Sequence, residues 1–161
     1  MDQIPKIREQ WKLSRPDLDT EPMEIIGRLL ILTSLIQSVL EPELQRQGLS
    51  LGGFDVLASL RRQGHPYELS PTELYQELLI TSGTMTSRLN NLEKRGLIAR
   101  RSHPGDRRSV VVSLTKSGKT MVDDLLNKRL ALEQQIVGTL SSDDQRRLGQ
   151  LLRKWILTFK S

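Results

Sequence analysis

The part of the sequence that most constrains the fold is the stretch 69–96, which has the pattern of two short helices separated by a tight break. Ser70 and Glu73 match a capping box, in which each side chain accepts a hydrogen bond from the other residue's backbone N–H. Pro71 suits the first helical position, because its missing N–H would have no partner there. The pattern therefore predicts a helix that begins after Ser70 and extends to about Leu79.

A second helix is predicted after the break, with Thr81 and Ser82 as candidate caps and Gly96 at its C-terminal end. At about 100° per residue, three apolar residues of this helix share one narrow stripe and are predicted to pack inward. These residues are Met85, Leu89 and Leu92. Two short helices joined in this way are typical of the helix-turn-helix, whose second helix enters the DNA major groove.

The opposite face of the second helix carries small polar residues, which allow close approach to base edges and phosphates. Its outward and flanking positions are Gly83, Thr84, Thr86, Ser87, Asn90, Asn91 and Lys94. Any exposed helix also carries Ser, Thr and Asn, so this face alone fits either DNA contact or simple solvation. The residues that we predict to contact DNA from this helix are Ser82, Thr84, Thr86, Ser87, Asn90 and Lys94.

A basic hairpin is predicted directly after the helix pair. The segments 97–102 and 109–114 have the composition of short strands, and they flank 103–108, a turn-rich basic tip. Two helices followed by a basic hairpin indicate a winged helix-turn-helix. The wing adds Arg107 and Arg108 to the predicted DNA contacts.

The positive charge of the chain is concentrated in this region. Residues 81–109 hold seven Lys or Arg against two acids, a net charge of +5 that equals the net charge of the whole chain. The other 132 residues balance, 17 against 17. Basic charge gathered on one predicted surface indicates a polyanionic partner such as nucleic acid.

Composition favours a single domain with an aliphatic core and excludes several kinds of site. The chain has 161 residues, enough for one domain with a real core, and aromatics contribute only 4%. The absence of cysteine excludes disulfides, thiolate zinc sites and a cysteine-based redox sensor. His65 and His103 both fall in predicted loops. We therefore predict no catalytic residue, no metal site and no cofactor.

Capping residues locate the other helix ends. Ser50 and Thr115 are each placed to begin a helix, and Gly48 is placed to end one. Ser142 with Gln145 resembles a capping box for the last helix.

Amphipathic helices are predicted on both sides of the winged module, which we place at 50–114. Residues 1–15 suggest a short extra helix, 20–48 a long helix that Pro42 kinks or interrupts, and 115–160 two further helices. Their aliphatic faces can be buried only against each other or against a second copy, and an isologous homodimer is the economical solution. Such a dimer presents two recognition helices about 34–36 Å apart, which predicts a pseudo-palindromic site.

With these elements in place, the sequence resembles the MarR family of bacterial transcriptional regulators over nearly its whole length. The most specific matches are Leu-Ser-Pro-Thr-Glu-Leu at 69–74, Arg-Leu-x-x-Leu-Glu-x-Arg-Gly-Leu-Ile at 88–98, and the Asp-Arg-Arg wing with its Val-Ser-Leu-Thr continuation within 106–115. The resemblance implies an obligate homodimer whose wings reach adjacent minor grooves. It also implies that Asp106 orients the wing and that Arg108 enters a minor groove, where narrow A·T-rich sequence concentrates negative potential.

A closer resemblance is to the PecS-like, urate-responsive branch of this family. It is carried by the extra N-terminal helix with its tryptophan, by the Pro-Asp-Leu-Asp-Thr linker at 16–20 and by the Phe-Asp-Val-Leu-Ala-Ser-Leu-Arg-Arg run at 54–62. The resemblance implies a ligand site made by that tryptophan, by an Asp and an Arg of one helix and by an Arg of the recognition helix. These residues map onto Trp11, Asp55, Arg62 and Arg88.

Helical geometry is consistent with this ligand site. Asp55 and Arg62 are seven residues apart and share a helix face, and Arg88 lies about 60° from the apolar stripe, closer to the core than to the DNA face. A guanidinium and an indole suit a purine anion such as urate. An anion bound by Arg88 would repel Asp55 and shift the recognition helix, so ligand and DNA would weaken each other's binding. In the alternative, Trp11 anchors the extra helix and the other three form an ordinary ion-pair cluster.

The sequence therefore predicts a cytoplasmic, sequence-specific DNA-binding regulator, a repressor that a small anionic aromatic ligand releases from its operator. The predicted partners are double-stranded DNA, a second copy of the chain and a urate-like effector. No membrane partner is predicted, because the N-terminus is polar and the most apolar run, 29–40, is too short to span a bilayer. A constitutive architectural DNA binder remains an alternative, as does a protein-interaction module, which the basic segment argues against. An enzyme is not predicted.

Overall fold

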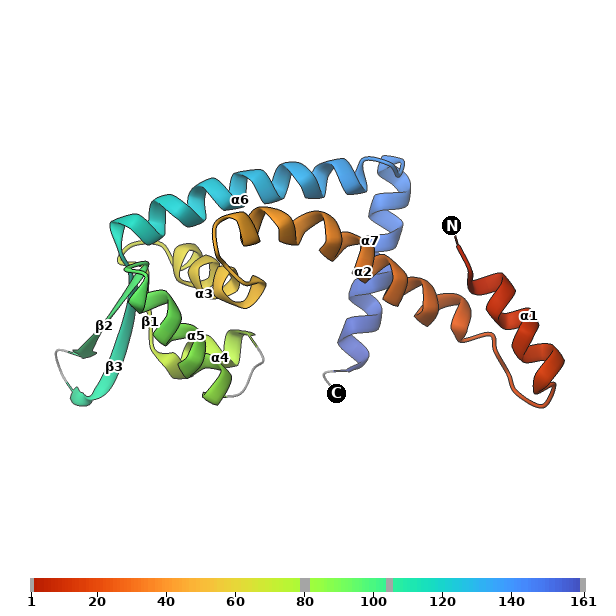
Figure 1. The fold of residues 1–161 in the computed structure, drawn as a ribbon, viewed down its shortest axis with the longest axis horizontal. Coiled ribbons are helices and arrows are strands. Elements are labelled where there is room, and N and C mark those ends of the chain that lie inside the picture. The colour runs from red at the N-terminus through yellow and green to blue at the C-terminus, as the bar shows by residue number, and fades with distance from the viewer. Residues whose placement is uncertain (1, 79–81, 104–105, 160–161) are drawn as a thin grey trace. The chain divides into compact units, whose positions relative to one another are not determined.

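A computed structural model of the chain describes most of its length in two compact units (Figure 1). The described residues are 2–78, 82–103 and 106–159, without the side chains of Ser82, His103 and 106–109. The units are Met1–Glu41 and Pro42–Ser161, and each is described by itself.

The first unit pairs α1 (Ile4–Ser14) with the beginning of α2 (Met23–Arg46). Ile4 is buried to 4% exposure and packs where Gly27 leaves room: a Cβ on Gly27 would lie 2.4 Å from Ile4 Cδ1. The extra N-terminal helix predicted at 1–15 is therefore present, and Ile4 is the apolar side chain that holds it against α2.

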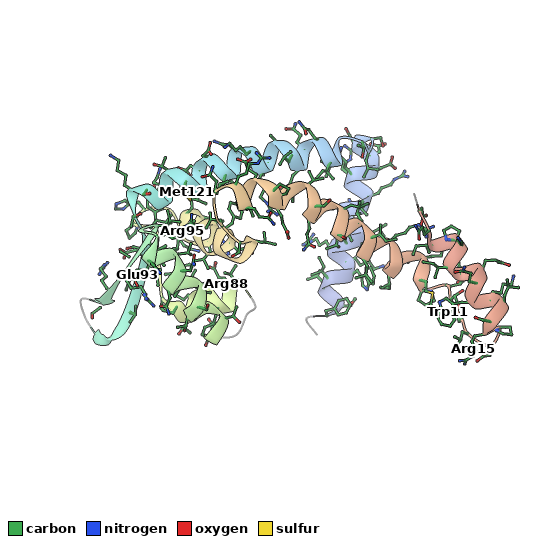
Figure 2. The ribbon with its side chains drawn as sticks, viewed as in Figure 1. Trp11, Arg15, Arg88, Glu93, Arg95 and Met121 are labelled. Atoms are coloured by element: carbon green, nitrogen blue, oxygen red, sulfur yellow. The ribbon has the colours of Figure 1, made fainter. Side chains whose placement is uncertain are left out.

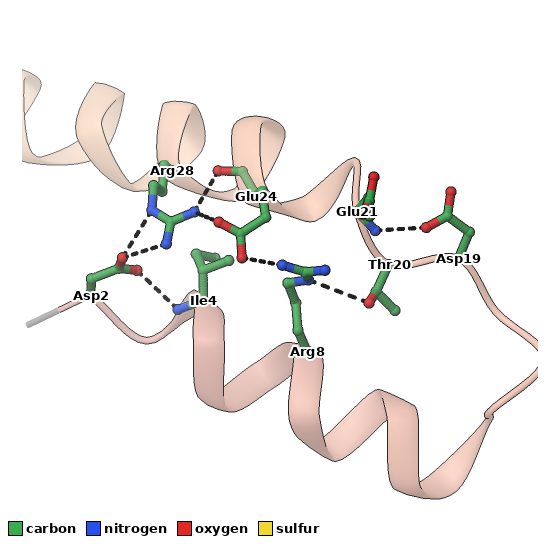
Figure 3. A network of polar contacts seen from close by, with 8 residues as sticks. All are labelled: Asp2, Ile4, Arg8, Asp19, Thr20, Glu21, Glu24 and Arg28. Carbon is green, nitrogen blue, oxygen red and sulfur yellow. Dashed lines mark hydrogen bonds and ion pairs between the residues drawn. The ribbon is translucent and has the colours of Figure 1, made fainter.

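A polar network surrounds this contact (Figure 3). Arg8 of α1 forms an ion pair with Glu24 of α2, and Arg28 pairs with Glu24 and with Asp2, whose Oδ2 lies 2.7 Å from its Nη2. Each pair is largely solvated and contributes little by itself, because water screens exposed charges. Together the pairs fix the register of α1 on the first turns of α2.

Pro42 does not interrupt the long helix, so of the two predicted alternatives, a kink or a restart, the restart does not occur. α2 is continuous from Met23 to Arg46 with Pro42 inside it, and the boundary between the two units falls between Glu41 and Pro42. The helix ends as predicted at Gly48, whose φ of 64° lies in the left-handed region that glycine tolerates.

α2 presents an unusually apolar exposed surface. By length and composition alone it is long and apolar enough to cross a membrane, a property that helices of soluble proteins also show. Its large exposed hydrophobic residues are Ile25, Ile26, Leu30, Ile31, Leu32, Leu35 and Val39. An exposed apolar surface of this kind indicates a contact with another protein surface.

The winged helix-turn-helix is confirmed within the second unit. Its helices are α3 (Leu51–Arg62), α4 (Pro71–Leu78) and α5 (Ser82–Lys94). Its antiparallel sheet has the order β1-β3-β2, from β1 (Glu68–Leu69), β2 (Ile98–His103) and β3 (Asp106–Leu114). β1 was not predicted, because a strand of two residues is too short to show an alternating pattern.

An aliphatic core joins the elements of the second unit, as the composition predicted. Its side chains with at most 2% exposure include Val56, Leu57, Leu60, Leu74, Met85, Leu89, Leu92, Leu97, Ile98, Val112, Val122 and Leu125. They come from α3, α4, α5, both long strands and α6 (Lys116–Val137), except Leu97, which lies between α5 and β2. α5 is therefore held by the same core that supports the wing.

Capping confirms most of the predicted helix starts. Ser50 Oγ accepts a hydrogen bond from Gly53 N at 3.1 Å, and Thr115 Oγ1 accepts one from Gly118 N at 3.0 Å. Ser70 and Glu73 form the reciprocal capping box, with Ser70 N donating to Glu73 Oε2 at 2.7 Å. Each cap of this kind contributes about 1 kcal/mol to stability.

The cap of the last helix differs from the prediction by one residue. α7 (Ser142–Thr158) is capped by Ser141, which accepts from Asp144 N at 3.2 Å. Gln145 instead donates to the carbonyls of Val137 and Leu140, at 3.0 and 3.1 Å. Two adjacent serines offer two caps, and the aspartate in the first turn together with the end of α6 selects the earlier one.

We expect Gly118→Ala to destabilise the protein by ~1–3 kcal/mol, because a new methyl group in a packed core forces backbone shifts. The added Cβ would lie 1.9 Å from the carbonyl oxygen of Leu97, where the wing joins α6. Urea unfolding followed by circular dichroism measures the change. Gly83→Ala is the matched control, since its Cβ meets nothing within 4 Å. Equal stability of the two variants would contradict the close packing at Leu97.

Candidate functional site

The faces of α5 agree with the sequence analysis. Met85, Leu89 and Leu92 are 1–2% exposed and point into the core. The residues predicted to point outward or to flank that face are all exposed: Gly83, Thr84, Thr86, Ser87, Asn90, Asn91 and Lys94. The helix therefore offers a polar outer surface. That these residues contact DNA stays a prediction, and the side chain of Ser82 lies outside the described part.

The turn at the wing tip is shorter than predicted. β2 extends to His103 and β3 begins at Asp106, so the turn expected at 103–108 is largely strand. Cross-strand pairing continues to the tip, with His103 opposite Asp106. Asp106, Arg107 and Arg108 thus belong to β3. Their side chains lie outside the described part, so the wing-orienting and groove-binding roles stay predictions.

Part of the basic charge of this region has internal partners. Arg95 donates to the carbonyls of Gly48 and Gln47, both at 2.6 Å, and so binds the C-terminal end of α5 to the turn after α2. Arg101 of β2 donates to both carboxylate oxygens of Glu68 on β1, at 2.9 and 2.8 Å. Counting charges along the sequence could not show this, because Glu68 lies outside the basic segment.

Opposite charges near the end of α5 bind different neighbours. Glu93, in the last turn of α5, binds Arg100 of β2, whereas Arg95, directly after the helix, binds the turn after α2 (both residues are labelled in Figure 2). Among the side chains described between 81 and 109, Lys94 is exposed and has no ion-pair partner. Lys94 is therefore the described cation of this segment best placed to meet a phosphate.

Asp55 lies half-buried on α3, in the field of three guanidinium groups from three helices. Burial raises the pKa of the Asp55 carboxyl above its ordinary value. The positive charges of Arg129, Arg88 and Arg62 lower this pKa, but by less than burial raises it. Within the described part of the chain, no group donates a hydrogen bond to this carboxylate. Its negative charge is therefore only partly compensated.

Arg88 lies over the first turn of α3, where Gly52 leaves space for its guanidinium (Figure 2). A Cβ on Gly52 would lie 2.2 Å from Arg88 Cζ and 2.5 Å from both Nε and Nη2. Arg88 is half-buried and, among the described residues, its guanidinium has no hydrogen-bond acceptor. The prediction that Arg88 turns toward α3 rather than toward the DNA face is consistent with this contact.

Arg62 and Arg129 also have partners of their own. Arg62 is exposed and forms an ion pair with Glu77 of α4. Arg129 of α6 donates from Nε to Glu133 at 2.8 Å, and its Cζ lies 5.4 Å from the centre of the Phe54 ring. Arg129 was not among the predicted site residues. Its i, i+4 spacing to Glu133 indicates only a surface ion pair, and nothing in the sequence connects it with α3.

Trp11 belongs to the first unit, so its approach to the other three predicted ligand residues stays a prediction. It is 42% exposed on α1, whereas Ile4 on the same helix is buried. The alternative in which Trp11 anchors the extra helix is therefore not favoured within this unit. An exposed indole remains available to another surface or to a ligand.

Other kinds of site are not evident in the described part of the chain. It holds no group of three His, Asp or Glu side chains placed to bind a metal ion. One open hollow is lined by Gln47, Lys116, Ser117, Thr120, Met121 and Asp124. These residues include none of those predicted to bind the ligand.

Comparisons with known proteins agree with this geometry. A family model described as MarR family matches residues 47–109. The transcriptional regulator PecS of Dickeya dadantii is 38% identical over 150 residues, which cover 93% of this chain and 90% of PecS. A mutant of MarR from E. coli, solved with operator DNA, is 28% identical, with a TM-score of 0.69 over 84% of this chain and 98% of that one. BpsR of Bordetella bronchiseptica, whose DNA binding is regulated by 6-hydroxynicotinic acid, is 26% identical, with a TM-score of 0.73 over 86% and 97%.

Asp55→Asn should become increasingly stabilising relative to the wild type as the pH rises from about 3 to about 7. The folded state has the raised pKa, so it retains a proton that the unfolded chain has lost. The wild type therefore loses stability as pH rises through that interval, whereas the amide has no charge to bury. Urea unfolding at both pH values measures the difference.

Asp123→Asn is the control, because its stability relative to the wild type should change with pH in the opposite direction. The hydrogen bond from Arg61 holds the pKa of Asp123 below its ordinary value, so its charged form favours folding. This variant should lose stability relative to the wild type as the pH rises. A pH trend of the same sign in both variants would contradict the burial cost assigned to Asp55.

Proposed function

Because the chain belongs to the MarR family of DNA-binding transcriptional regulators, which are not enzymes, we propose that it is a repressor released from its operator by a small anionic aromatic ligand, urate or a similar purine. The operator is pseudo-palindromic and the regulator binds it as a homodimer in the cytoplasm. Outward-facing residues of α5 and the arginines of β3 carry the DNA contacts.

The observation that carries the ligand proposal is the environment of Arg88. A buried or half-buried guanidinium normally has bidentate acceptors, because unsatisfied charged donors are costly. Arg88 has none in the described part of the chain and lies against Gly52, close enough to Asp55 to lower the pKa of that carboxyl. A planar anion would supply the missing acceptors, and Trp11 would supply an aromatic surface or an indole donor.

The route from ligand to DNA is short, because Arg88 sits on the recognition helix itself. An anion at Arg88 adds negative charge beside Asp55, whose charged form is already disfavoured by burial. Repulsion between the two anions then favours a changed position of α5 against α3, and this displaces its outer face from the groove. Linkage requires DNA to weaken ligand binding by the same factor, typically about 5- to 150-fold.

The homodimer proposal is supported by apolar residues that the chain leaves exposed. α7 has no buried residue over its 17 positions. Its large exposed hydrophobic side chains are Leu148, Leu151, Ile156 and Leu157, followed by Phe159 just after the helix. Helices in proteins gain most of their stability by packing an apolar face, so the exposed apolar residues of α7 and of α2 both need a packing partner. A second copy of the chain satisfies both.

In a gel-shift titration, urate should dissociate a specific complex between the protein and DNA from upstream of its own gene. Hypoxanthine, a purine without the negative charge at neutral pH, should not. Gly52→Ala should keep DNA affinity within about threefold and reduce the response to urate by tenfold or more, because the new methyl group occupies the position of the Arg88 guanidinium.

The outcomes of this titration separate the parts of the proposal. A specific complex that is indifferent to urate would remove the effector and keep the regulator. An affinity that depends on the salt concentration but not on the DNA sequence would favour an architectural DNA binder instead.

Leu151→Glu should weaken dimerisation at least about 100-fold. It removes a side chain whose burial in the proposed interface contributes about 1.5–3 kcal/mol in each copy, and it places a charge in an apolar interface. Sedimentation equilibrium measures the dissociation constant of the dimer. Gln150→Glu on the same helix adds the same charge at an exposed polar position and should leave the dimer unchanged. A stable dimer of the Leu151 variant would place the interface elsewhere.

A further inference from the structure

A cluster of three side chains joins the recognition helix to the wing. Arg100 of β2 donates from Nε to Glu93 Oε2 at 2.9 Å and from Nη2 to Asn90 Oδ1 at 2.8 Å. Its backbone N donates to Glu93 Oε1 at 3.1 Å. Glu93 and Asn90 are three residues apart on α5, so both reach the same guanidinium. The cluster therefore connects the last turns of α5 with the root of the wing.

The guanidinium decides how the Asn90 amide is oriented. Arginine has five N–H donors and no acceptor, so the amide atom that faces it must be the oxygen. The amino group of a planar amide then points away from Arg100. A free asparagine can exchange its two ends by rotating about its last side-chain bond, whereas this one is held by a charge-assisted hydrogen bond.

Arg100 is bound within the protein through both its backbone and its side chain. Glu93 binds it through both carboxylate oxygens, one on the side chain and one on the backbone N–H. The hydrogen bond from Arg100 lowers the pKa of Glu93, so the carboxylate keeps its charge at neutral pH. This pairing explains why an arginine counted in the basic segment is not a free phosphate ligand.

Asn90 lies on the outer face of α5. It is exposed, three residues after Ser87 and four before Lys94, both of which are also exposed. At helical spacing these three side chains form one stripe on the outer surface. The amino group of Asn90 is therefore presented on the surface predicted to face DNA.

On the basis of the DNA-binding function proposed above, we propose that Asn90 contacts DNA as a hydrogen-bond donor through its amino group, and that Arg100 and Glu93 position it. An unconstrained asparagine can turn both ends of its amide toward adenine, donating to N7 and accepting from N6. Because the Asn90 oxygen faces Arg100, its amino group is the end presented to acceptors on the DNA: guanine N7 or O6, or a phosphate oxygen. Arg100 and Glu93 act through Asn90 and do not touch DNA.

Asn90→Asp tests the donor. The aspartate keeps an oxygen for Arg100 but places a second, charged oxygen where the amino group was. Affinity for an operator selected in vitro by the protein should fall at least about tenfold more than in Asn91→Asp, which adds the same charge at the neighbouring exposed position. Fluorescence anisotropy with labelled operator measures both. Equal losses in the two variants would overturn the proposal.

Arg100→Lys tests the positioning role while keeping the charge. A lysine is a compact point charge without the planar fork that spans Glu93 and Asn90, so the amide is released. Affinity should fall about as far as in Asn90→Ala, with an unchanged salt dependence. Wild-type affinity in Arg100→Lys would overturn the positioning role, because a direct phosphate contact survives exchange of one cation for another. Thermal unfolding confirms that each variant is folded.

A panel of operators with single base-pair changes identifies the acceptor. If Asn90 binds guanine, Asn90→Ala loses discrimination at one G·C pair, and Arg100→Lys makes adenine acceptable there. If it binds a phosphate, both variants weaken every operator equally. Both results support a donor. Preference of the wild type for adenine at a position that Asn90→Ala no longer discriminates would contradict it, since bidentate pairing with adenine requires the Asn90 oxygen to face the base rather than Arg100.

Discussion

The structure depends on the burial of one narrow stripe of the recognition helix. Met85, Leu89 and Leu92 are almost completely removed from water, within a core shared with α3, α4, α6 and the sheet. Because a helix has fixed angular spacing, burying these three side chains also determines which residues face outward. The polar outer face, the inward turn of Arg88 and the exposure of Asn90 all follow from that packing.

Two charged contacts hold the C-terminal end of the same helix. Arg95, directly after α5, binds the carbonyls after α2, and Glu93 binds Arg100 at the root of the wing. Arg88, by contrast, lies over the first turn of α3 without a hydrogen-bond acceptor among the described residues. This arrangement suits the proposed regulation, in which an anion bound at Arg88 changes what the outer face of α5 can bind.

Sequence patterns predicted the elements well where local chemistry controls them. The capping box at Ser70, the cap at Thr115 and the left-handed Gly96 each depend on residues within a few positions, and all are present. Errors occurred where neighbours decide. The last helix is capped by Ser141 rather than by Ser142, and the two-residue β1 has no pattern of its own.

The sequence by itself determined the winged helix-turn-helix and the faces of α5, because periodicity, capping and motif spacing are local properties. Only the tertiary structure decided which charged side chains interact with one another. It pairs Arg101 with Glu68, connects Arg100 with Asn90 and Glu93, and adds Arg129 to the surroundings of Asp55. Electrostatic partners are set by distance in space, and residues far apart in the chain carry no common pattern that would reveal them.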